Sequence, residues 1–131
     1  MVFLYEIMVY CVIYNLTKNM VRKMTFVVTD NCIQCKYTEC VTVCPTNSFH
    51  EGLNFVVINP ENCINCSLCE TMCPVGAIFT EAEVLKLDKE FIKLNEELSK
   101  VLPVIYCRKE PLKDAKKWEN ISNKLRFLKL M

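Results

Sequence analysis

Eight of the ten cysteines lie between Cys32 and Cys73, where their spacing is typical of metal ligands. The later four read Cys63-x2-Cys66-x2-Cys69-x3-Cys73-Pro74, the bacterial iron-sulfur run whose fourth cysteine binds a different cluster from the first three. Three thiolates at three-residue steps can wrap a loop around one cluster, whereas the cysteine before the proline lies too far along to return. The spacing therefore predicts two interlocked iron-sulfur clusters.

An internal repeat extends this motif to the earlier cysteines. Asn31 to Cys35 reads N-C-I-Q-C and Asn62 to Cys66 reads N-C-I-N-C, at an offset of 31. Further along, Cys40 and Cys44 align with Cys69 and Cys73 at an offset of 29. By this repeat, we expect a 4Fe-4S cluster held by four soft thiolates, from Cys44, Cys63, Cys66 and Cys69.

The other predicted site is less regular. It would take Cys73 together with Cys32, Cys35 and Cys40, but four residues rather than two separate Cys35 from Cys40. This longer gap breaks the even wrap of the loop, so Cys35 is either a fourth ligand or displaced from the cluster.

Other uses of clustered cysteines fit the spacing less well. Zinc ribbons use two separated Cys-x2-Cys pairs, and a plant-type 2Fe-2S centre needs the order x4 then x2. A secreted disulfide scaffold is disfavoured, because no positive charge precedes the apolar N-terminal run and no small-residue cleavage site follows it. The cysteines therefore indicate a reducing compartment, and we expect a cytoplasmic protein.

The elements expected around the cysteines are short. Residues 25–28 and 55–58 are β-branched runs, and residues 48–50 and 77–79 can pair with them, so we predict two small hairpins, one per half. Residues 51–54 have the turn residues to join 48–50 to 55–58. Short helical turns are expected over 38–43 and 67–72, each ended by a proline. The fold class is therefore α+β, with two pseudo-symmetric halves of short hairpins and helices and a C-terminal helical extension.

Residues 81–131 differ in character from the cysteine region. They hold 12 Lys and Arg against 9 acids, whereas residues 24–80 hold 1 Lys and 5 acids. Two stripes at helical spacing predict amphipathic helices, one from Val84 to Val101 and one from Trp118 to Leu128. Such helices commonly pack on their own domain, and docking of a partner protein is the minority interpretation.

The apolar run at the N-terminus, residues 1–16, is interrupted by Glu6 and is shorter than the roughly 20 apolar residues of a transmembrane helix, so we expect no membrane anchor. We interpret residues 1–23 as the result of a misassigned start codon, with a peripheral membrane helix as the alternative. The expected organisation is an N-terminal extension at 1–23, a two-cluster core at 24–80 and a helical extension packed on it at 81–131.

Residues 25 to about 128 resemble the seven-iron ferredoxins of bacteria, which carry a long C-terminal extension. The resemblance rests on Phe26 to Cys32, on Cys35 to Cys40 and on the run from Cys63 to Pro74. It implies a 3Fe-4S cluster on Cys32, Cys40 and Cys73, beside the 4Fe-4S cluster on Cys44, Cys63, Cys66 and Cys69. Cys35 would then be a free thiol. Ser48, which often is a cysteine in similar ferredoxins, and the basic tail depart from the family pattern.

Several residues outside the ligand set are also candidates for a role. Glu39, next to Cys40, is a candidate proton carrier, with a solvated surface carboxylate as the alternative. We expect His50 at the surface, Cys11 as a non-ligand and Cys107 as a small apolar filler in the tail. Tyr37 and Trp118 are expected to pack rather than to relay electrons.

No nucleotide loop, hydrolase triad or nucleic-acid-binding face is evident, so an enzyme is not predicted. We expect a soluble, monomeric, low-potential carrier that passes single electrons from one redox enzyme to another, with no membrane partner. Two alternatives remain: an iron or redox sensor with a labile three-iron site, and a ferredoxin subunit of a larger oxidoreductase.

Overall fold

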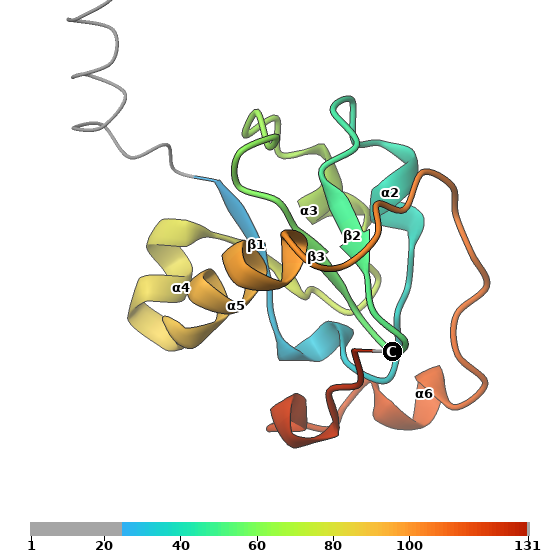
Figure 1. Ribbon diagram of the computed structural model, residues 1–131. Helices are drawn as coiled ribbons and strands as arrows, with labels where there is room; N and C mark the ends of the chain where they lie inside the picture. The colour runs from blue at the N-terminus through green and yellow to red at the C-terminus, as the bar shows by residue number, and fades with distance from the viewer. Residues whose placement is uncertain (1–24, 131) are drawn as a thin grey trace, which may run out of the picture.

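The computed structural model describes residues 25–130 (Figure 1). The two interpretations of residues 1–23 therefore lie outside the described residues. The chain forms a small mixed structure of short helices and strands, as predicted. Its elements, in order, are β1 (Phe26–Val28), η1 (Asp30–Cys32), α2 (Glu39–Thr42), β2 (Phe49–Glu51), β3 (Val56–Ile58), α3 (Leu68–Met72), β4 (Ile78–Thr80), α4 (Glu81–Leu87), α5 (Glu90–Ser99), α6 (Ala115–Trp118) and η2 (Lys124–Phe127).

The four strands form two antiparallel pairs. β2 and β3 form a hairpin with Phe49 opposite Ile58, as the predicted turn at 51–54 requires, and β1 pairs with β4, with Val28 opposite Ile78. The prediction of one hairpin in each half is wrong, because the turn joins the two halves, while cysteine loops separate the strands within each half.

A buried amide on α5 joins the two sheets. The Oδ1 atom of Asn95 accepts hydrogen bonds from the backbone N–H groups of Val28, at 3.1 Å, and Ile58, at 2.9 Å. Its Nδ2 atom donates to the carbonyls of Val28, at 2.9 Å, and Phe91, at 2.7 Å. One side chain thus supplies hydrogen-bond partners to backbone groups at the edges of both β1 and β3. Without it, these buried groups would need to pair directly between the two strands.

The first amphipathic stripe forms two helices rather than one. α4 begins with a capping box between Thr80 and Glu83, and it ends at Asp88, whose backbone is extended. The Asp88 carboxylate then accepts the N–H of Glu90, at 3.2 Å, at the start of α5. The prediction of a single helix over 84–101 is therefore wrong, because the extended backbone at Asp88 ends α4 before α5 begins.

The second stripe is mostly irregular. Only α6 and the single 3-10 turn η2 are helical, and Asn123 between them has a left-handed backbone, with φ 56°. The helix predicted over 118–128 is therefore wrong. The chain turns at Asn123, and Lys124 is fully buried instead of lying on an outer helical face.

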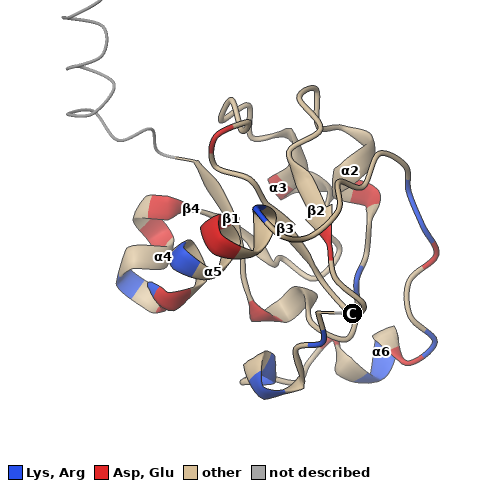
Figure 2. Cartoon of the chain, in the orientation of Figure 1, with Lys and Arg blue, Asp and Glu red and all other residues tan. Residues whose placement is uncertain are grey.

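The C-terminal extension wraps around the cysteine region (Figure 1). Backbone hydrogen bonds join Ile105 to Phe49, Leu112 to Cys35 and Lys129 to Leu53. The basic segment along one side of the molecule (Figure 2) neutralises core acids, because Arg108 pairs with Glu39 and Lys109 with Glu51. None of the helices within residues 25–130 is long and apolar enough to cross a bilayer.

We predict that Asn95→Ala destabilises the protein by on the order of 3 kcal/mol, because it leaves the buried N–H groups of Val28 and Ile58 without acceptors. The measurement is guanidinium unfolding of the cluster-loaded protein, followed by circular dichroism under anaerobic conditions. Asn120→Ala, at an exposed position, is the matched control. Equal unfolding midpoints for the two variants would contradict the role given to Asn95.

Candidate cluster-binding sites

Four of the cysteines predicted to bind one cluster line a single cavity. Cys44, Cys63, Cys66 and Cys69 surround an empty volume of about 310 Å³ that is partly open to solvent. The remaining wall is mainly apolar and includes Phe26, Phe49, Ile58 and Ile64. Four soft sulfur donors around an apolar space suit an iron-sulfur cluster, so the residues present fit this group.

The segments that supply these four cysteines come from both halves of the core. Cys44 follows α2, whereas Cys63 and Cys66 lie in a loop before α3 and Cys69 lies within α3. Burial, followed by the nearby charges of Cys63, Cys66 and Cys44, raises the pKa of Cys69 to about 12. Within residues 25–130, no three His, Cys, Asp or Glu side chains converge closely enough to hold a single metal ion.

A second group of thiols gathers beside the first. Cys32 and Cys40 are buried and Cys73 is half-buried. Burial raises the pKa of Cys32 to about 12, with further increases from the charges of Cys73 and Cys35. Burial also raises the pKa of Cys40, and the charges of Cys32, Cys73 and Cys69 add to that effect. The charges that act on Cys32 and Cys40 are thus largely those of other thiols of the cysteine region.

Cys35 is held by the C-terminal extension. Its Sγ atom donates a hydrogen bond to the carbonyl of Ala115, at 3.3 Å, and the Nζ atom of Lys124 lies 3.7 Å from the same sulfur. The side chain is completely buried. Burial raises its pKa, and the adjacent Lys124 only partly opposes that shift.

The two cysteine loops share an unusual backbone conformation. Positive φ angles occur at matching positions of the two loops, namely Gln34 and Asn65 within Cys-x2-Cys, Lys36 and Ser67 just after it, and Asn47 and Gly76 after Cys-Pro. Non-glycine residues seldom adopt such angles. Their recurrence shows that both loops turn in the same way around their cysteines.

Backbone N–H groups also contact matching sulfurs. The N–H of Ser48 donates to the Sγ atom of Cys44, at 3.4 Å, and the N–H of Ala77 donates to the Sγ atom of Cys73, at 3.3 Å. Burial alone would raise the pKa of Cys44, but hydrogen bonds from Ser48 and Thr46 outweigh it, and the pKa is lowered. Both Cys-Pro turns thus present a donor that stabilises negative charge on sulfur.

Glu39 directly precedes Cys40, a thiol of the second group. Its Oε1 atom pairs with Arg108, at 3.5 Å, while its Oε2 atom is buried without a hydrogen-bond partner among the described residues. The carboxylate is thus neither fully solvated nor fully paired.

Two sequence predictions for single residues are wrong. His50 is buried rather than at the surface, because it lies in β2 beneath the extension and its Nδ1 atom bonds the carbonyl of Leu102, at 2.7 Å. Cys107 is exposed rather than a filler, since the segment around it is an outer loop. Cys11 lies outside the described residues.

Tyr37 and Trp118 have packing contacts, in keeping with their predicted roles. Tyr37 donates a hydrogen bond to Glu119, which places the hydroxyl beside a carboxylate and raises its pKa to about 12. Trp118 packs edge-on against Phe127, with ring centroids 4.8 Å apart. The sequence analysis missed Lys124 and Asn95, because a polar residue beside an apolar stripe ordinarily indicates a solvent-facing position.

Comparisons with known proteins identify the family of the chain. The family described as a 4Fe-4S binding domain matches residues 56–79, and one described as a domain of unknown function (DUF3470) matches residues 89–129. Ferredoxin-1 of Caulobacter vibrioides is 45% identical over 101 residues, which cover 77% of this chain and 88% of that protein. A ferredoxin of Rickettsia felis is 42% identical over 105 residues, covering 77% and 92%. The chain belongs to the bacterial ferredoxins, iron-sulfur electron carriers rather than enzymes.

Proposed function

We propose that this ferredoxin carries single electrons between redox enzymes through one 3Fe-4S and one 4Fe-4S cluster. The observation that carries the proposal is a difference between the two cysteine groups in the contacts that their cysteines make. Four cysteines face one cavity, whereas Cys35 of the other group is engaged by Ala115 and Lys124 of the extension. That leaves Cys32, Cys40 and Cys73 as the available ligands of the three-iron cluster.

The proposed four-iron cluster binds Cys44, Cys63, Cys66 and Cys69. Since Cys44 precedes the β2–β3 hairpin and Cys73 follows α3, each half of the core lends one ligand to the other half's cluster. The matching positive φ angles and N–H···S hydrogen bonds support this two-cluster arrangement. In this reading residues 24–80 form the cluster-binding core and residues 81–131 the extension.

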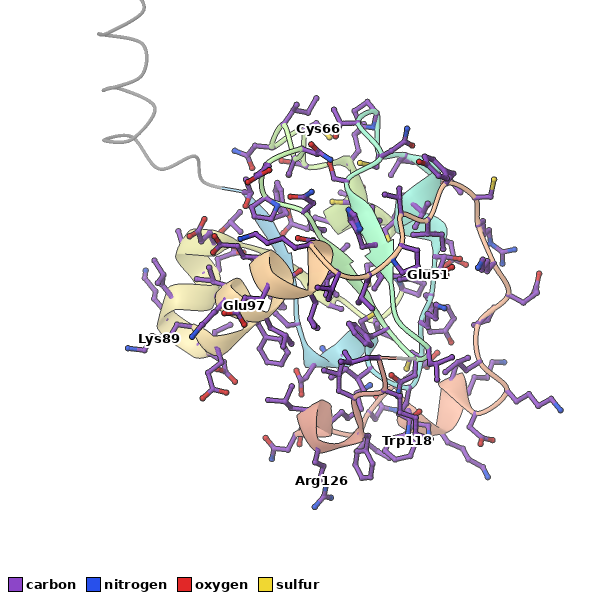
Figure 3. The ribbon with its side chains drawn as sticks, viewed as in Figure 1. Glu51, Cys66, Lys89, Glu97, Trp118 and Arg126 are labelled. Carbon is purple, nitrogen blue, oxygen red and sulfur yellow. The ribbon has the colours of Figure 1, made fainter. Side chains whose placement is uncertain are left out.

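A bound iron-sulfur cluster supplies reversible one-electron redox chemistry. The surrounding protein then affects the reduction potential of the cluster and how closely water and partner proteins can approach it. The N–H groups of Ser48 and Ala77 stabilise negative charge on two ligands, and Phe26 and Phe49 keep water from the cavity wall. Cys66 is exposed at one end of the molecule (Figure 3), which gives a partner enzyme a short route to the second cluster.

The partners in this proposal are an electron-donating reductase and an electron-accepting enzyme, and the chain acts as a monomer. We place it in the cytoplasm, where reducing conditions keep thiols available for cluster assembly. The complete burial of Cys35 disfavours the sensor alternative, which needs a thiol that oxidants can reach.

The cluster composition is tested by iron and sulfide analysis with low-temperature EPR on anaerobically purified protein, before and after dithionite. We expect about seven iron atoms per chain and the EPR signal of an oxidised three-iron cluster. Cys35→Ala should keep both, and Cys40→Ala should lose the three-iron signal. About eight irons without that signal would make Cys35 a ligand, and zinc in place of iron would refute the carrier function.

Thiol reactivity tests the position of Cys35 independently. In the cluster-loaded protein, iodoacetamide should modify exposed Cys107 quickly and leave Cys35 unmodified until guanidinium unfolds the chain, because burial raises its pKa and blocks access. Peptide mass spectrometry identifies the modified sites, and Cys107→Ser is the control. Modification of both thiols at similar rates would refute this placement.

Glu39 is proposed to transfer a proton to the reduced three-iron cluster. We expect Glu39→Gln to weaken the pH dependence of that cluster's reduction potential and to slow its reduction at low pH, since a neutral amide cannot carry the proton. Protein-film voltammetry measures both quantities. Glu110→Gln, which alters an exposed partner of Arg108, is the control. An unchanged pH dependence in Glu39→Gln would reject the assignment.

A further inference from the structure

Lys124 is a fully buried lysine in η2, far along the chain from the cysteine it contacts. Its Nζ atom donates hydrogen bonds to the carbonyls of Asn31, at 2.8 Å, and Trp118, at 3.0 Å. The Sγ atom of Cys35, 3.7 Å away, is its third neighbour. The three N–H donors of the ammonium group are therefore satisfied. Their acceptors are two backbone carbonyls and a thiol, all of which are uncharged.

The positive charge of Lys124 has no carboxylate partner within residues 25–130. None of the ion pairs among those residues includes its Nζ atom. The nearby Asp30 carboxylate accepts the backbone N–H of Lys124, at 3.4 Å, and Glu119 accepts the hydroxyl of Tyr37. Burying an uncompensated charge is costly, so a second source of negative charge is expected close by.

The contacts of Lys124 point to the proposed site of the three-iron cluster as the source of this negative charge. Asn31, whose carbonyl binds the ammonium group, directly precedes the proposed ligand Cys32. The side chain of Asn31 donates to the carbonyl of Val75, at 3.2 Å, in the loop that follows the proposed ligand Cys73. Lys124 is thus joined, through one residue, to the backbone beside two of the three thiolates proposed for this cluster.

We propose that Lys124 is the buried cation that compensates the negative charge of the three-iron cluster and raises its reduction potential. This inference rests on the proposed function, since it needs a cluster on Cys32, Cys40 and Cys73. Lys124 acts as a positioning and electrostatic residue and binds no iron itself.

The direction of the effect follows from electrostatics. Reduction adds one electron to the cluster, and a fixed positive charge close by favours the more negative state. Because the charge is buried, the effective dielectric constant around it is low and dissolved salt screens it weakly. The second cluster, whose ligand Cys66 lies at the end of the molecule opposite Trp118 (Figure 3), should be affected much less.

The test is an EPR-monitored redox titration of the cluster-loaded protein, with dithionite as reductant. Lys124→Met and Lys124→Gln should shift the potential of the three-iron cluster to more negative values and leave the four-iron potential nearly unchanged. Lys124→Arg should keep the wild-type value, and so should Lys116→Met, which removes an exposed charge from α6. The shift should persist when the titration is repeated at high salt.

Each outcome bears on the proposal. Neutral variants that only lower the unfolding midpoint, with both potentials unchanged, would show a packing role and overturn it, as would equal shifts at both clusters. If neither neutral variant assembles the three-iron cluster while Lys124→Arg does, the requirement for a cation is supported, and if Lys124→Arg also fails, the proposal falls. A wild-type protein without a three-iron signal would instead refute the proposed function.

Discussion

Convergence of Cys44 with Cys63, Cys66 and Cys69 on one cavity is the constraint on which the rest of the chain depends. These cysteines come from both sides of the β2–β3 hairpin, so the hairpin must reverse the chain before the second cysteine loop can reach the first. The same reversal returns β4 to the free edge of β1. Strands of three residues gain little from their own ladders, and their pairing is therefore set by where the cysteine loops must meet.

A core this small buries too little apolar surface to be stable on its own, and the extension contributes what is missing. Leu102 and Ile105 join the same hydrophobic cluster as the strands, and Asn95 pairs edge groups of both sheets. The extension is thus a structural part of the cysteine region rather than an appended domain. Ligation of an iron-sulfur cluster adds folding free energy, since its ligands come from segments that only the folded chain brings together.

The parts of the structure that local spacing determines could be predicted from the sequence. The Cys-x2-Cys-x2-Cys run and the repeat grouped four cysteines as ligands of one cluster, and these four line one cavity. The prolines predicted where α2 and α3 would end. Features set by distant contacts could not be predicted. The stripe from Val84 to Val101 gives no sign that the chain would become extended at Asp88 and divide it into two helices. Lys124 is polar by type, although its surroundings bury it.

The two cysteine sites differ most in what covers them, and this difference follows from the path of the extension. Ala115, Trp118 and Lys124 close over the loop that holds Cys35, whereas Cys66 in the matching loop of the second half remains exposed. Two loops with the same backbone turns thus have different surroundings, one dry with a buried cation and one open to solvent. Because burial and fixed charge both alter redox energetics, the surroundings of a cysteine loop affect the potential of a bound cluster as much as the sequence motif itself does.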